Sequence, residues 1–327
     1  MKKLFLTHIT SYSYINPVVE SSNKILLYPF NDLNQQVVSH EIEISENPKI
    51  FTYLDNFNNR VGFFSYSLPH KKLIINSSAE IIKKKNDYPL SKYSVNDQWK
   101  FYNNNYLNLN YISFLRSKKF KYESDALSII SDLKATNDSP LELLLKLCNY
   151  IYNNFEYKKG VTDIYTPLDK VWEIRSGVCQ DFSNVLIKLC NIIQIPARYV
   201  SGYIYTEKKY RGYNATHAWV EVLIPGYGWV GLDPTNNIIS NENHIKLAVG
   251  RNYNDCSPVR GVFKGNEKQE MEVKVLVDTK KNINNSDYDL DENVYDKTKS
   301  NEDENNDFQN SYRKRLEIIQ QQQQQQQ

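Results

Sequence analysis

The chain has 327 residues, enough for two domains of ordinary size, and its 40 Lys and Arg nearly balance its 38 Asp and Glu, giving a formal net charge of +2. This balance argues against a polycation that coats nucleic acid, and no stretch approaches the ~20 apolar residues of a membrane span. Hydrophobic residues make up 40% of the chain, which suffices for a packed core. The four cysteines contain no CxxC pair and are too sparse for a disulfide scaffold, so we expect free thiols in a cytoplasmic protein that does not associate with membranes.

Residues 1–85 are predicted to form a small antiparallel β domain, a sandwich or barrel. Apolar and polar residues alternate with period two over residues 10–14, 37–44 and 73–82. Turn signals are expected to separate the strands at the dipeptides that begin with Asn16, Asn31, Asn47 and Asn58. Residues 86–138 have weaker periodicity and are predicted to be a connector that carries a helix or two.

Residues 139–281 are predicted to be an α+β domain. A capping box formed by Ser139 and Glu142 begins a helix with regularly spaced apolar residues, and a second helix follows Gly177. Strands are then expected, in one antiparallel sheet, over residues 198–205, 216–224, 229–232 and 272–277.

Residues 282–327 differ from the rest of the chain. They are rich in Asn, Asp and Glu and end in eight Gln. This segment holds 10 acidic and 5 basic residues, a net charge of −5, which leaves +7 on residues 1–281. Its low apolar content cannot offset the entropy of ordering, so the tail is predicted to be disordered. The polyglutamine run is interpreted as repeat expansion in a tolerant terminus, with self-association as the alternative.

Cys179 is the candidate nucleophile, because a Gly-containing turn leads it into the start of a predicted helix. A thiol in the first helical turn faces unpaired backbone N–H groups and the positive end of the helix dipole, and both stabilise a thiolate. The same N–H groups are suited to hold an oxyanion. Cys148 and Cys190 lie inside helical patterns among apolar neighbours and are interpreted as core residues.

A thiolate nucleophile needs a base, and the base needs an orienting partner. His217 opens one predicted strand, and Asp233 ends the next one after a turn at 225–228. If Ile224 pairs with Gly228, Asp233 lies opposite Trp219 and becomes a diagonal neighbour of His217 on the same face, within side-chain reach. Each residue alone has an ordinary structural interpretation, but a Cys, His and Asp in this order are a more specific pattern.

At these residues the sequence resembles the transglutaminase-like superfamily, in its bacterial two-domain form. The matching stretches are GVCQDF at 177–182, PARYVSGY at 196–203, THAWVEV at 216–222 and GWVGLDPT at 228–235. The N-terminal residues, from His8 to His70, are similar to the small β domain of that branch, although Asn58 stands where its pattern tends to have Gly.

The resemblance implies a papain-like α+β core in which Cys179 is the nucleophile, His217 the base and Asp233 the residue that orients His217, with no cofactor and no metal ion. Gln180 is expected to help the backbone N–H of Cys179 hold the oxyanion. Because the superfamily contains cysteine proteases, transglutaminases and peptide N-glycanases, the resemblance leaves the reaction open.

We therefore expect a cysteine-dependent hydrolase, a protease or amidase, that acts on peptide or isopeptide amides and has a peptide or protein as its partner. The first alternative is a protein-glutamine gamma-glutamyltransferase that uses the same triad, and the second is a non-catalytic binding module. A nucleic-acid partner is suggested only by the lysine run 83–85, which is short, lacks interleaved aromatic residues and is expected on a solvated face. We expect no nucleic-acid partner.

Overall fold

The computed structural model describes residues 1–85, 91–105, 108–115, 118–206, 211, 216–264 and 268–281, so the predicted tail lies outside the described residues. The chain divides into two compact units that interleave along the sequence. We call them the α+β unit, made of Met1–Lys3, Pro29–Gln36 and Ile82–Cys256, and the β unit, made of Leu4–Tyr28, Val37–Ile81 and the described residues of 257–281.

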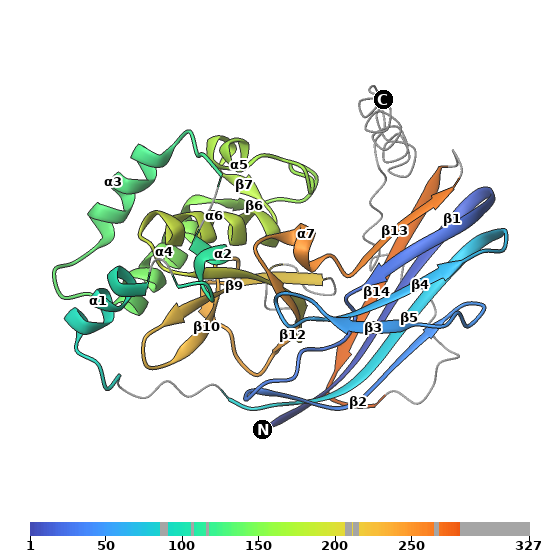
Figure 1. The fold of residues 1–327 in the computed structure, drawn as a ribbon. Helices are drawn as coiled ribbons and strands as arrows, with labels where there is room; N and C mark the ends of the chain where they lie inside the picture. The colour runs from blue at the N-terminus through green and yellow to red at the C-terminus, as the bar shows by residue number, and fades with distance from the viewer. Residues whose placement is uncertain are drawn as a thin grey trace, which may run out of the picture. The chain divides into compact units, whose positions relative to one another are not determined.

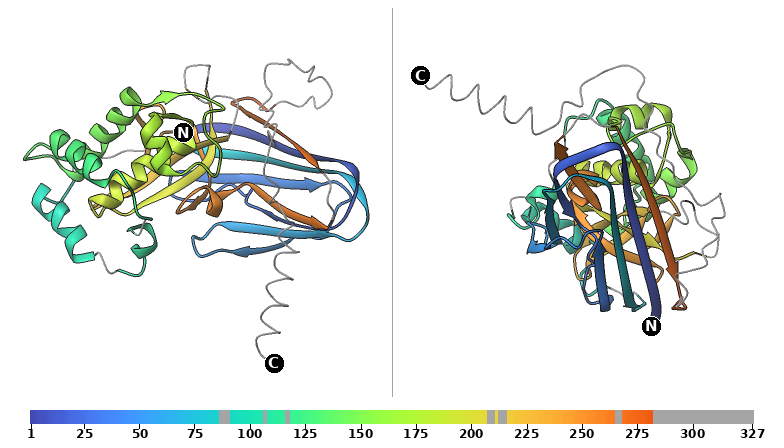
Figure 2. Two further views of the ribbon diagram at one scale, coloured as in Figure 1. Left: turned by 90° about the horizontal axis from the view of Figure 1, so that it is seen from above. Right: turned by 90° about the vertical axis from the view of Figure 1, so that its right-hand side faces the viewer.

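The β unit is an antiparallel half-barrel built around the long strand β1 (Figure 1). Its strand order is β2-β5-β1-β4-β3, and β13 and β14 also pair with β1. The strands are β1 (Lys2–Ile25), β2 (Gln35–Ile44), β3 (Phe51–Leu54), β4 (Arg60–Tyr66), β5 (His70–Lys83), β13 (Val259–Lys264) and β14 (Gln269–Asp278). Figure 2 shows the N-terminal strands in blue and cyan, with the C-terminal strands in orange alongside them. The three predicted N-terminal strands are confirmed within β1, β2 and β5.

Strand β1 runs straight through Asn16 and Pro17, so the predicted turn at this dipeptide is wrong. The two residues lie between two pairings of β1, one with β14 that reaches Tyr14 and one with β13 that begins at Val19. The phase of burial then shifts at Glu20, whose φ of 51° marks an irregularity in the strand. The other three dipeptides lie between strands as predicted, and Asn58 has a φ of 63°, a conformation that Asn tolerates in place of Gly.

The strand predicted over 272–277 exists, but it is not in the predicted sheet. It belongs to β14, which pairs antiparallel with β1 over Phe5 to Tyr14. The α+β unit ends at Cys256, so this strand belongs to the β unit. Alternation of side chains predicts that a segment is a strand, but it does not identify the strand's partner.

The α+β unit contains an antiparallel sheet in the order β11-β10-β9-β8-β12. Its strands are β8 (Ala197–Ile204), β9 (Thr216–Ile224), β10 (Gly228–Asp233), β11 (Ile238–Ile239) and β12 (His244–Gly250), with β6 (Glu156–Tyr157) and β7 (Ser176–Gly177) forming a separate parallel pair. Its helices are α1 (Val95–Asn105), α2 (Ile112–Leu115), α3 (Glu123–Leu133), α4 (Pro140–Asn154), α5 (Leu168–Ile174), α6 (Cys179–Ile192) and α7 (Tyr253–Cys256). Helix α6 packs on β8 and β9, and α4 packs on α6 and β10 (Figure 1).

Local signals account well for the main helices of this unit. The Ser139 hydroxyl accepts a hydrogen bond from the Glu142 backbone N–H, and the Glu142 carboxylate accepts one from the Ser139 N–H, so the predicted capping box is confirmed. The predicted second helix is α6. The described part of the predicted connector holds three helices rather than one or two. No helix among the described residues is long and apolar enough to cross a membrane.

The segment Pro29–Gln36 is bound to β12 of the same unit through the side chain of Gln35. The amide oxygen of Gln35 accepts hydrogen bonds from the Lys246 backbone N–H at 2.8 Å and from Lys83 Nζ at 3.2 Å. Its amide nitrogen donates to the carbonyl oxygens of Lys246 at 2.7 Å and Phe30 at 2.6 Å. The register of β12 against β8 shifts next to Lys246, so Gln35 satisfies backbone groups at an irregularity in the sheet.

Lys83 does not lie on a solvated face, so this expectation from the sequence is wrong. Its side chain is buried against Gln35, and burial lowers the pKa of Lys83 to about 8, although the nearby Asp32 carboxylate opposes this shift. The run 83–85 therefore does not present three adjacent free cations, which weakens the case for a nucleic-acid interface further.

Replacing Gln35 with Ala is expected to lower the free energy of unfolding of the α+β unit by about 2–4 kcal/mol, because buried donors and acceptors lose their partners. Urea unfolding followed by tryptophan fluorescence reports on this unit alone, since all four tryptophans (99, 172, 219 and 229) belong to it. The matched control is the exposed neighbour Gln36, whose replacement with Ala is expected to change the stability by under ~0.5 kcal/mol. Equal effects of the two substitutions would contradict this account.

Candidate active site

Cys179 is the first residue of α6, as predicted, and its side chain is partly exposed. The turn before it is fixed by Asp181, whose Oδ2 accepts hydrogen bonds from the Val178 N–H at 2.8 Å and from Thr162 Oγ1 at 2.6 Å. A Cβ on Gly177 would lie 2.5 Å from the same carboxylate oxygen, so this position requires glycine. Burial raises the pKa of Asp181, and these hydrogen bonds oppose the rise.

His217 and Asp233 come together by the register that the sequence predicts. Strand β9 pairs antiparallel with β10 so that Ile224 faces Gly228 and Val220 faces Leu232, which confirms the predicted pairing. Gly226 makes the tight turn between the two strands with a φ of 89°. His217 Nε2 then lies 2.8 Å from Asp233 Oδ2, and both side chains are completely buried.

The electrostatics favour an ion pair between these two side chains. Burial alone would lower the pKa of His217, but the charge and hydrogen bond of Asp233, with a further contribution from Cys179, raise it to about 10. Burial alone would raise the pKa of Asp233, but His217 and then His244 hold it well below its ordinary value. Cys179 is thus among the groups that raise the pKa of His217. Nδ1 is the ring nitrogen left for it, since this buried atom has no hydrogen-bond partner among the described residues.

Three further residues contact the Asp233 carboxylate, and none of them was given a role from the sequence. Oδ1 accepts the backbone N–H groups of Thr235 at 3.0 Å and Asn236 at 3.3 Å, while Oδ2 accepts Asn236 Nδ2 at 2.8 Å. His244 Nε2 lies 3.3 Å from Oδ2. Asn236 could have been predicted from the turn that follows Asp233. His244, at the start of β12, lies eleven residues after Asp233, and no nearby sequence pattern links the two.

His217, Asp233 and His244 also offer three possible metal ligands, whose atoms all lie within 4.8 Å of one another. Their hydrogen bonds argue against coordination. An ionised Asp233 can only accept hydrogen bonds, so Nε2 of each histidine must carry the proton that it donates. A protonated ring nitrogen does not bind a metal, and we therefore interpret the cluster as a hydrogen-bonded set of side chains.

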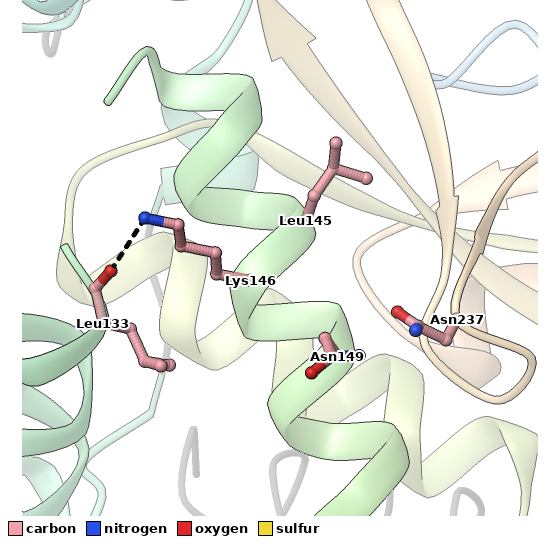
Figure 3. Close-up of a pocket in the computed structure, with 5 residues that line it drawn as sticks. All are labelled: Leu133, Leu145, Lys146, Asn149 and Asn237. Atoms are coloured by element: carbon pink, nitrogen blue, oxygen red, sulfur yellow. Dashed lines mark hydrogen bonds between the residues drawn. The ribbon is translucent and has the colours of Figure 1, made fainter. Parts of the chain in front are cut away.

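Gln180 follows Cys179 in the first turn of α6 and is partly exposed. Its predicted part in holding an oxyanion stays a prediction. A pocket of about 390 Å³ lies elsewhere in the unit, between α3, α4 and the turn after β10 (Figure 3). Its lining residues are Leu133, Leu145, Lys146, Asn149 and Asn237, and none of them belongs to the predicted triad.

Comparison with known proteins places these features in a family. Residues 128–234 match the family model described as the transglutaminase-like superfamily, and residues 4–82 match the bacterial transglutaminase-like N-terminal region. An uncharacterized protein of Mycobacterium tuberculosis is 31% identical over 288 residues, which cover 84% of this chain and 91% of that protein. A protein-glutamine gamma-glutamyltransferase of Pseudomonas aeruginosa is 28% identical over 123 residues, covering 35% of this chain and 18% of that enzyme.

Among solved structures, a candidate cysteine protease from Cytophaga hutchinsonii matches this chain with a TM-score of 0.65 and 21% sequence identity. The match covers 86% of this chain and 92% of the protease chain, so the two share the fold. The two family models match the two predicted halves of the chain, and the mycobacterial relative matches across nearly its whole length. The chain therefore belongs to the transglutaminase-like superfamily and carries the N-terminal region found in its bacterial members.

Proposed function

We propose that this chain is a thiol enzyme that cleaves peptide or isopeptide amides through Cys179, His217 and Asp233. The observation that carries the proposal is the buried hydrogen bond of 2.8 Å between His217 Nε2 and Asp233. This bond leaves Nδ1 of the same ring for the Cys179 thiol at the start of α6. An imidazolium stabilised by Asp233 favours the thiolate beside it, which is the nucleophilic form of cysteine.

In the proposed reaction the Cys179 thiolate attacks the amide carbonyl carbon and forms a tetrahedral intermediate. The backbone N–H of Cys179, which has no helical acceptor because it opens α6, holds the oxyanion, and Gln180 assists it. The His217 imidazolium gives its proton to the leaving nitrogen as the C–N bond breaks, leaving a thioester on Cys179. His217 then takes a proton from water, which attacks the thioester and releases the acid.

The second candidate is transamidation, in which a primary amine rather than water attacks the thioester. The name of the Pseudomonas aeruginosa relative favours it, since that protein is called a protein-glutamine gamma-glutamyltransferase. Water needs no acceptor groove on the protein, so hydrolysis remains the first choice.

Mass spectrometry of glutamine-containing peptides, incubated with and without a primary amine, tests the proposal. Backbone cleavage or deamidation supports hydrolysis, and incorporation of the amine supports transamidation. The Cys179→Ala variant should show none of these changes. If the wild-type chain also leaves a broad peptide mixture unchanged, a binding module that keeps the fold becomes the better reading.

A further inference from the structure

His244 is a buried histidine for which the proposed reaction has no use. Its Nε2 lies 3.3 Å from Asp233 Oδ2, the oxygen that also accepts His217 and Asn236. With the two backbone N–H groups at Oδ1, five donors surround one carboxylate. A carboxylate has about four lone-pair sites, so the donors on Oδ2 compete for the same acceptor capacity.

The hydrogen bonds of His244 specify where its proton lies. Nδ1 lies 3.2 Å from two atoms of Asn241, the backbone N, which donates to it, and Oδ1, which can only accept. An ionised Asp233 needs a donor at Nε2, so the single proton of the neutral ring is on Nε2, and Nδ1 accepts the Asn241 N–H. Burial lowers the pKa of His244, and although Asp233 opposes this, the nearby charges of His217 and Lys83 lower it further. His244 therefore donates to Asp233 as a neutral ring, whereas His217 donates to it as a cation.

The ring of His244 has little freedom to turn away from the carboxylate. Its backbone N–H bonds to the carbonyl oxygen of Asn241, which closes a tight turn before β12. The ring lies edge-on against Trp219, with centroids 5.2 Å apart and an interplanar angle of 76°. The His217 ring also packs on Trp219, with centroids 6.2 Å apart. Trp219 thus packs against both histidines.

From this arrangement we propose that His244 is a positioning residue, which fixes the Asp233 carboxylate and takes up part of its hydrogen-bonding capacity. Asp233 can then orient His217 without binding the imidazolium proton of His217 too strongly. The proposal rests on the proposed function, because it assigns His244 to the same site. The other titratable groups near the cluster are Cys179 of α6, Cys148 of α4 and Lys83. A neutral donor makes a carboxylate a weaker base, so its removal strengthens the hold of Asp233 on the proton of His217.

The experiment measures the rate at which iodoacetamide alkylates Cys179 between pH 4 and pH 11, so that the profile includes the loss of the His217 proton. His244→Leu and His244→Met remove the donor at similar volume, and His244→Gln keeps an N–H that can reach Asp233. In the Leu and Met variants the upper step of the profile, at which His217 loses its proton, is expected to move to higher pH by about half a unit, which is about a threefold change in that equilibrium. The Gln variant is expected to follow the wild-type curve.

An unchanged upper step for Leu and Met, or a shift to lower pH, would overturn the role of His244. The shift must also disappear when the same substitutions are made in an Asp233→Asn chain, because His244 acts only through that carboxylate. Thermal melting of each variant identifies any that do not fold. If the wild-type chain shows no alkylation in the acid range above that of Cys179→Ala, the proposed function itself fails, and this outcome is distinct from an unchanged pH profile.

Discussion

Iodoacetamide at pH 6 is expected to alkylate one cysteine of this chain, and the Cys179→Ala variant is expected to lose this labelling completely. Cys148, Cys190 and Cys256 are buried, and burial raises the pKa of both Cys148 and Cys190 well above the ordinary thiol value. Cys179 alone is partly exposed, and its proposed partner is His217, whose pKa Asp233 raises. The mass of the intact protein before and after labelling counts the adducts.

The matched control is Cys256→Ala, which removes a buried thiol that has no part in the proposed chemistry and should label like the wild-type chain. A third variant separates a paired thiolate from an ordinary exposed thiol. His217→Gln should lower the labelling rate at pH 6 by at least about tenfold, yet approach the wild-type rate near pH 9, where an ordinary thiol ionises. Undiminished labelling of Cys179→Ala would remove Cys179 as the reactive thiol.

The parts of the fold that the sequence predicted correctly are those fixed by neighbouring residues. The capping box of Ser139 and Glu142 lies within one helical turn, and the pairing of β9 with β10 follows from a three-residue turn that leaves one register. The same register allowed the sequence to predict that the side chains of His217 and Asp233 lie within reach of each other. In each case a short segment carries all the information that its conformation needs.

The predictions that failed depended on residues far away in the chain. Alternation identified the strand at 272–277, but its partner β1 lies more than 250 positions earlier. The dipeptide at Asn16 has the composition of a turn, yet strand pairing on both sides of it keeps β1 extended. Lys83 looked like a solvated cation because its acceptor, Gln35, lies 48 residues before it.

The candidate site shows the same division between local and distant signals. Cys179, His217 and Asp233 each stand at the end of a helix or strand that the sequence locates. His244 could not be found in this way, because the bulge in β12 and the turn at Asn241 decide where its ring points. A residue that acts through another residue leaves no motif of its own.

A buried charge network lies in the same sheet as the site and makes a second strong prediction. Glu221, two residues beyond Trp219 on the same face of β9, is bound by Arg198 Nη2 at 2.6 Å and by Lys246 Nζ at 2.7 Å. Lys246 also pairs with Asp32 at 2.6 Å, and the guanidinium of Arg198 lies over the ring of Trp229. One carboxylate therefore joins three strands of the sheet, β8, β9 and β12, to one another.

Replacing Glu221 with Ala is expected to lower the free energy of unfolding of the α+β unit by about 3–5 kcal/mol. Among the described residues, the substitution leaves the largely buried Arg198 with no carboxylate partner and leaves Lys246 with Asp32 alone, and an uncompensated buried charge costs about this much. Urea unfolding monitored by tryptophan fluorescence measures the loss. The control is Glu173→Ala, which breaks exposed ion pairs with Lys121 and Lys170 and should cost under ~1 kcal/mol.

Acid should remove the stability that Glu221 supplies, and the sign of this effect is fixed by the direction of its pKa shift. Burial alone would raise the pKa of Glu221, but the charges of Lys246 and Arg198 outweigh burial and lower it to about 2. Its contribution is therefore complete above the pKa of an unfolded glutamate, about 4.5, and is lost as the pH falls toward 2. The stability difference between the wild-type chain and Glu221→Gln should narrow over this range. A difference that stays constant between pH 5 and pH 2.5 would show that the Glu221 charge does not hold these strands together.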